Sequence, residues 1–100
     1  MSDPIRLEIP HQLGRAVARE RVERGVARFA EIIPGGVISD QHWDGDRFAF
    51  AVEAMGQRVT SRFDILDDRL LAEFDLPPML AMFAGKIRDK LAREAPKMLE

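Results

Sequence analysis

The chain has 100 residues, a formal net charge of -2 and no cysteine. The lack of cysteine excludes disulfide frameworks, thiol nucleophiles and cysteine-ligated zinc. The acidic balance argues against general nucleic-acid binding, which relies on a surplus of lysine and arginine. Since 46% of the residues are hydrophobic, we expect one modest core and a single α+β domain spanning residues 1–100.

The N-terminal stretch MSDPIRLEIP lacks the pattern of a signal peptide, because Asp3 and Arg6 interrupt the apolar run that such a segment needs. Elsewhere no stretch approaches the roughly 20 consecutive apolar residues of a transmembrane helix. We therefore expect a soluble cytoplasmic protein without a transmembrane segment.

Residues 5–9 alternate apolar and charged side chains, which predicts a strand with one buried face that ends at Pro10. From His11 to Ile33 the apolar residues recur every three or four positions, which predicts a long amphipathic helix. The sequence PGG at residues 34–36 is expected to end this helix.

The middle of the chain has the alternation and the turn residues of consecutive β-hairpins. A two-residue turn at Gly56-Gln57 would pair Phe50 with Phe63. A turn at Asp67-Asp68 would pair Phe63 with Ala72. Both hairpins then share one apolar face.

The segment DQHWDGD, residues 40–46, contains three aspartates and one histidine, which are residue types that bind metal ions in protein loops. A calcium loop starting at Asp40 would have His42 at its third position and Ala51 at its twelfth, where oxygen ligands are needed. Asp44-Gly45 between two strand-like runs instead predicts a hairpin turn. We therefore expect no metal site in this segment.

The strand that leads into this turn has a mixed face, which predicts a position at the edge of the sheet. The residues of that face are Val37, Ser39, Gln41 and Trp43.

After Pro78 the helical period returns and continues along the rest of the chain. Gly85 is expected to mark a close approach of this helix to the sheet, and Pro96 is expected to end or kink it. The predicted order is β-α-β-β-β-β-α. Since only one face of each strand is apolar, we predict an α+β fold, an antiparallel sheet with two helices packed on one face.

Three stretches carry a resemblance to a known family. They are PHQLGRAVARERVE, WDGDRFAFAVEAMGQRVTSRFDILDD and LPPMLAMFAGKIRDKL. They resemble the small bacterial polyhydroxyalkanoic acid system family, whose members are encoded near polyester storage-granule genes. The resemblance spans nearly the whole chain and implies a role in polyester storage, with an undefined molecular activity and no catalytic residues to carry over.

No pattern of catalytic residues is found in the sequence. It has no glycine-rich phosphate loop, no Gly-x-Ser-x-Gly elbow and no His-Glu-x-x-His motif. His11 is expected to bind backbone groups at the start of the first helix. His42 and its neighbouring aspartates are explained by a solvated turn, with a weak cation site or a general-base cluster as the alternative. We expect no enzyme activity, no cofactor and no metal.

Two surfaces are candidates for binding. Basic residues at positions 21, 24 and 28 form a stripe on the first helix, although the interleaved glutamates can pair with them. The second surface begins at the last helix, where methionines lie beside basic residues and suit an apolar or anionic partner surface. The candidate partner-binding residues are Met79, Met82, Phe83, Lys86 and Arg88.

We therefore predict a non-enzymatic accessory protein of the polyhydroxyalkanoate storage system that binds a protein partner or the granule surface. One alternative is a small hydrophobic-ligand-binding domain with a pocket between a curled sheet and the C-terminal helix. That pocket would be lined by Phe48, Phe50, Phe63 and Phe74. A second alternative is a ribosome or RNA-binding module, which the acidic balance disfavours. A homo-oligomer is compatible with the sequence.

Overall fold

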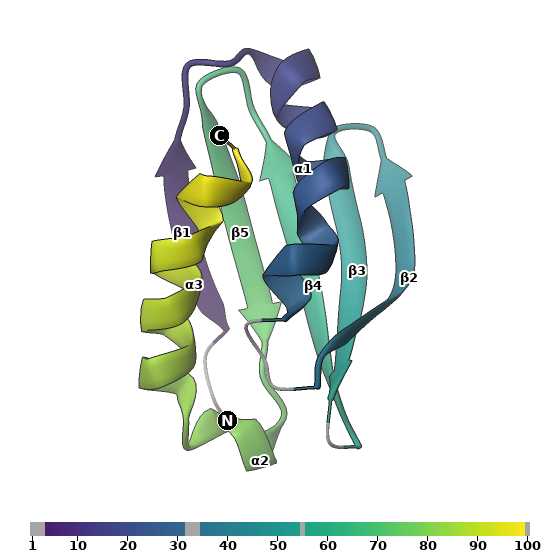
Figure 1. Ribbon diagram of the computed structural model, residues 1–100, viewed down its shortest axis with the longest axis vertical. Helices are drawn as coiled ribbons and strands as arrows, with labels where there is room; N and C mark the ends of the chain where they lie inside the picture. The colour runs from purple at the N-terminus through teal and green to yellow at the C-terminus, as the bar shows by residue number, and fades with distance from the viewer. Residues whose placement is uncertain (1–3, 32–34, 55, 100) are drawn as a thin grey trace.

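The computed structural model describes residues 4–31, 35–54 and 56–99. The elements in chain order are β1 (Ile5–Pro10), α1 (Arg15–Ala30), β2 (Val37–Asp44), β3 (Arg47–Ala54), β4 (Gln57–Ile65), β5 (Arg69–Asp75), α2 (Pro78–Ala81) and α3 (Ala84–Met98). The strands form an antiparallel sheet in the order β1-β5-β4-β3-β2. The helices α1 and α3 lie side by side on one face of this sheet (Figure 1). The predicted α+β fold is confirmed, with α2 as an additional short helix.

The core lies between the sheet and the two long helices. Its largest side chains from the sheet are Phe48, Phe50, Phe63 and Phe74, each at most 2% exposed. Neighbouring rings in this row have centroids between 5.1 and 5.8 Å apart. Val22 of α1 and Leu91 of α3 close the core from the helical side. Since burying one such side chain contributes about 1.5–3 kcal/mol, this layer supplies much of the driving force for folding.

The register of the β4–β5 hairpin is the predicted one, because Phe63 pairs with Ala72. The predicted register of the β3–β4 hairpin is wrong by two residues. Phe50 pairs with Ser61, and Ala54 pairs with Gln57, so the turn lies one residue earlier than Gly56-Gln57. A shift of two residues leaves the same side chains on the core face, so alternation alone does not distinguish the two registers.

The strand β2 lies at a sheet edge, as predicted. The predicted set of inward residues is wrong, because the pairing with β3 shifts between Ser39 and His42. Asp40 has a φ of 53° within this bulge, and the extra residue reverses the alternation. Ile38 before the bulge and Trp43 after it consequently both pack against the core.

The first helix begins at Arg15, four residues later than predicted. Gly14 has a φ of 79°, which is outside the helical region, so the helix starts only after it. The predicted helix end at Ile33 lies outside the described residues.

The last helix differs from the prediction in two places. The chain leaves helical geometry after α2, because Phe83 has φ and ψ values of -102° and 11°. Pro96 does not end α3, which continues to Met98. Only two residues of α3 follow Pro96, so the lost hydrogen bond and any kink displace little of the helix. Met98 and Leu99 are buried, and the C-terminal turn therefore docks against the core.

The helices α1 and α3 approach each other closely at Gly25 of α1. A Cβ atom built on Gly25 would lie 2.5 Å from Cγ and 3.4 Å from Cα of Met98. Gly85, which was predicted to mark a close approach, is exposed and has no atom within 4 Å of such a Cβ position. The predicted close approach to the sheet at Gly85 is therefore wrong, because glycine in a helical stretch does not by itself show that its side of the helix is packed.

We expect Gly25→Ala to lower the free energy of unfolding by about 1–2 kcal/mol, because the new methyl group must displace Met98. Gly85→Ala is the matched control and should be neutral or stabilising by up to about 1 kcal/mol, since alanine favours a helix. Urea denaturation of both variants measures the difference. Equal changes in the free energy of unfolding for the two variants would show that Met98 does not obstruct a methyl group at residue 25.

We expect Phe63→Ala to cost on the order of 3 kcal/mol or more, because Phe63 is fully buried. Arg62→Ala changes the adjacent residue, which points to the opposite face of the sheet, and should cost less than about 1 kcal/mol. Urea denaturation compares the two variants. Similar losses of stability would mean that the two faces of β4 are assigned incorrectly.

Candidate functional site

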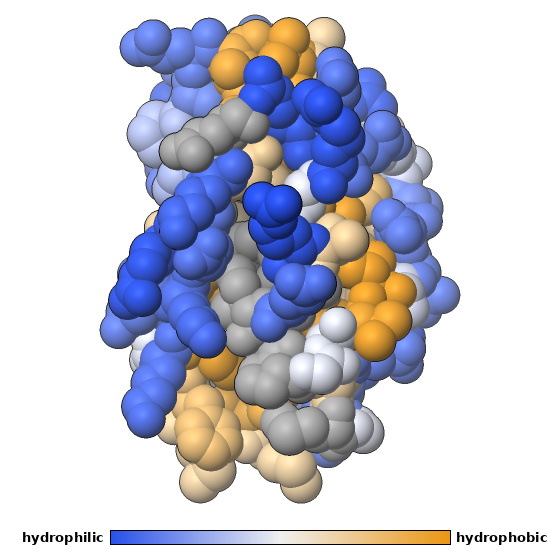
Figure 2. All heavy atoms as spheres, viewed as in Figure 1, coloured by the Kyte–Doolittle hydropathy of each residue, from blue (hydrophilic) through white to orange (hydrophobic). Residues whose placement is uncertain are grey.

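Exposed apolar side chains gather where α2 meets α3. The exposed fractions are 61% for Met79, 78% for Met82 and 48% for Phe83, and we call these three residues the apolar tip. These side chains are exposed around the break between α2 and α3. Leu80, which lies between Met79 and Met82 in the chain, is buried and anchors α2 to the core. The tip lies at one end of the long axis of the molecule (Figure 1), where Figure 2 shows hydrophobic atoms on the surface. It is a protruding surface and not a pocket.

Two basic residues flank the apolar tip at the start of α3. Lys86 and Arg88 are both exposed. Among the described residues neither forms an ion pair. Residues two positions apart point in directions about 200° apart around a helix, so these cations lie on different sides of α3. All five predicted partner-binding residues are therefore accessible at one end of the molecule.

Two of the three aspartates of the DQHWDGD segment bind arginines. Asp40 forms an ion pair with Arg58. Asp46 lies 2.9 Å from Nη1 of Arg15 and 3.6 Å from Nη1 of Arg19. The two pairs of Asp46 tie the turn between β2 and β3 to the start of α1, which gives Asp46 a structural role.

Trp43 makes a second connection between this segment and α1. Its indole Nε1–H donates a hydrogen bond of 2.9 Å to Oε1 of Glu23. The guanidinium carbon of Arg19 lies 4.4 Å from the centroid of the tryptophan ring, within range of a cation–π interaction. Within residues 4–31, 35–54 and 56–99, no group of three or more His, Asp or Glu side chains is placed to hold a metal ion.

His11 is buried and uses both ring nitrogens in hydrogen bonds. The backbone N–H of Leu13 donates to Nδ1 over 3.2 Å, so Nδ1 is unprotonated. Nε2 then carries the proton and donates to the carbonyl of Leu66 over 3.0 Å. As expected, His11 binds backbone groups near the start of α1, and it also joins that loop to the turn between β4 and β5.

The four phenylalanines proposed to line a ligand pocket contact one another and form part of the core. The space between the sheet and the C-terminal helix is thus occupied by their own rings. The structure has a groove of about 470 Å³ between α1 and α3 and another of about 400 Å³ on the outer face of the sheet. Neither groove is lined by a phenylalanine. The geometry does not favour the hydrophobic-ligand alternative.

The outer groove lies in a surface of paired charges. Arg6 and Arg62 both bind Glu73, and Arg62 also lies 3.2 Å from Asp75. The hydrogen bond from Arg62 lowers the pKa of Glu73. Because these charges satisfy one another, we interpret the outer face as a solvated surface of the sheet.

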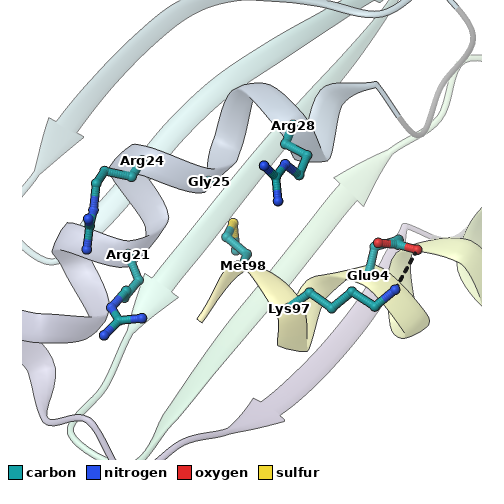
Figure 3. Close-up of a pocket in the computed structure, with 7 residues that line it drawn as sticks. All are labelled: Arg21, Arg24, Gly25, Arg28, Glu94, Lys97 and Met98. Carbon is teal, nitrogen blue, oxygen red and sulfur yellow. Dashed lines mark hydrogen bonds and ion pairs between the residues drawn. The ribbon is translucent and has the colours of Figure 1, made fainter. Parts of the chain in front are cut away.

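The groove between the helices has a different lining, which the sequence predicted only in part. Its residues are Arg21, Arg24, Gly25, Arg28, Glu94, Lys97 and Met98. Figure 3 shows the arginines along α1 opposite the residues of α3. The basic stripe of the first helix was expected to pair with glutamates of the same helix. Of its members, Arg24 does so, with Glu20 at 3.3 Å. The pattern of α1 alone did not show that α3 would provide the opposite wall.

The structure is that of a small α+β protein with an exposed apolar tip and a basic groove between its helices. The chain matches, over residues 5–99, the model of the family described as "Putative polyhydroxyalkanoic acid system protein (PHA_gran_rgn)". It belongs to this polyhydroxyalkanoic acid system family, as its sequence resemblance implied. No curated protein and no solved structure matches it. No helix of the described residues is long and apolar enough to cross a membrane.

We expect added calcium or magnesium to leave the Tm unchanged apart from effects of ionic strength. Asp40 and Asp46 bind arginines in the folded state, so a cation would have to displace those partners before it could stabilise the fold. Thermal unfolding at matched ionic strength provides the measurement. A saturable rise in Tm that Asp44→Ala abolishes would identify a cation site in this segment.

Proposed function

We propose that this protein is a non-enzymatic, cytoplasmic accessory protein of the polyhydroxyalkanoate storage system that binds the granule surface through the apolar tip. Its family supports the connection with polyester storage. The observation that carries the proposal is the exposure of Met79, Met82 and Phe83 at one end of the molecule.

The chemistry of the apolar tip suits insertion into an apolar surface. Removing apolar side chains from water is favourable by roughly 25 cal/mol per Å² of buried area. Methionine is unbranched and polarizable, so Met79 and Met82 can adapt to a surface without a fixed shape. Lys86 and Arg88, on different sides of α3 next to the tip, can orient the protein towards a surface with negative charge.

The size of the tip favours the granule surface over a protein partner. A stable protein–protein interface usually buries about 800 Å² on each partner and needs complementary shapes. The tip consists of three protruding side chains with no concave surface between them. Such a feature needs a soft partner that closes around it, as the surface of a lipid or polyester particle does.

We expect the double variant Met79→Gln/Met82→Gln to lose binding to polyester particles. Wild-type protein should co-sediment with protein-free polyhydroxyalkanoate particles, whereas the variant should remain in the supernatant because its tip cannot bury apolar area. Both methionines are more than half exposed, so the fold should be retained, which circular dichroism and Tm can verify.

The control variant is Val37→Gln/Leu71→Gln, which removes exposed apolar side chains on the outer face of the sheet. It should co-sediment like the wild type. If the folded Met79→Gln/Met82→Gln variant still co-sediments fully, the apolar tip is not the binding surface. If wild-type protein binds native granules but not protein-free particles, its partner is a granule protein. Failure to bind either kind of particle would overturn the proposed function.

A further inference from the structure

The groove between α1 and α3 concentrates positive charge in a chain that is acidic overall. Four cations line it, three arginines from α1 and Lys97 from α3, together with the single carboxylate of Glu94. The whole chain has a net charge of -2. The positive surplus in this groove is therefore a local feature, formed where the two helices meet (Figure 3).

The ion pairs within the groove leave two arginines available. Lys97 lies 3.3 Å from Glu94, and Arg24 is paired on its own helix. Within the part of the chain that the structure describes, Arg21 and Arg28 form no ion pair. They are seven residues apart, which places them on the same side of α1 and about 10.5 Å apart along its axis.

The floor of the groove is formed by Gly25 of α1 and Met98 of α3 and carries no charged side chain. Gly25 lies between Arg21 and Arg28, and Met98 packs against it in the space that a side chain at residue 25 would occupy. The side chain of Met98 from α3 points towards Gly25 (Figure 3). The volume of about 470 Å³ is in the range of small-molecule sites. It is a groove with basic walls and a floor without a charged side chain.

We propose that this groove binds an anion with two or more phosphate groups, held by Arg21 and Arg28 and assisted by Arg24 and Lys97. Guanidinium groups present paired donors that match phosphate oxygens in two-point contacts. The spacing of Arg21 and Arg28 suits an elongated anion better than a single phosphate. Arg24 and Lys97 can turn from their glutamates to the ligand at small cost, because exposed ion pairs contribute little.

This inference does not depend on the apolar tip, which uses other residues and another kind of interaction. The phosphate groups can belong to a soluble compound or to lipid headgroups at a surface. Both sources share the chemistry that the groove recognises, and they can be separated by experiment.

The first experiment is calorimetric titration with inorganic tripolyphosphate at low ionic strength. We expect saturable binding to the wild type and at least about a tenfold loss of affinity for Arg21→Gln/Arg28→Gln. The control, Arg6→Gln/Arg58→Gln, changes the net charge equally on the outer face of the sheet and should stay within about twofold of the wild type. Met79→Gln/Met82→Gln should also bind normally. Tm and circular dichroism confirm that each variant is folded.

The second experiment uses vesicles of phosphatidylglycerol and of phosphatidylcholine. Binding of tripolyphosphate without binding to either vesicle supports a soluble ligand. Binding to phosphatidylglycerol vesicles that requires Arg21 and Arg28 supports a headgroup phosphate. An equal loss of affinity in the outer-face control, or binding to neither probe, would overturn the proposal. Binding to a single-stranded RNA oligonucleotide with no affinity for tripolyphosphate would also overturn it and assign the groove to nucleic acid.

Discussion

The close contact between Gly25 and Met98 determines how the helical layer covers the sheet. Because Gly25 has no side chain, Met98 can pack directly against α1, and the last turn of α3 is buried with it. The contact fixes one end of α3, while the buried Leu80 holds the chain just before its other end. Between these two anchors α3 covers the β1 side of the sheet and α1 covers the other side (Figure 1). The groove and the tip both depend on this arrangement.

Much of the fold is predictable from the sequence because only one face of each strand is apolar. That constraint determines the order of the elements, the antiparallel sheet and the single helical layer. It does not determine the register between two strands or the position of a β-bulge. A register shift of two residues between β3 and β4 keeps Phe50 and Phe63 inside, whereas the bulge at Asp40 places Ile38 inside in place of Val37. Such features depend on turn and bulge geometry that local composition does not encode uniquely.

The two candidate surfaces were predictable to different degrees. Met79 and Met82 fall outside the apolar period of the last helix, so their exposure could be expected from spacing alone. The groove combines residues about 70 positions apart in the sequence, and its formation depends on which helix faces which. The arginine stripe of α1 was visible in the sequence, but the neutral floor at Gly25 and the cation at Lys97 came from the packing of α3. Candidate binding residues chosen from one helix therefore miss a groove that two helices form together.

The tip and the groove lie towards opposite ends of α3 and rely on interactions with opposite responses to salt. Burial of Met79 and Met82 removes apolar area from water and is strengthened by salts such as sulfate. The proposed recognition of an anion by Arg21 and Arg28 would weaken as salt screens exposed charges. Phe83 and Lys97 are fourteen residues apart, a separation of about 21 Å along a helix. A surface that offers both apolar polymer and phosphate headgroups can engage both ends of α3 at once, whereas a soluble phosphate compound would occupy the groove and leave the tip free. The salt dependence of particle binding thus distinguishes a protein held by its tip alone from one held along the whole of α3.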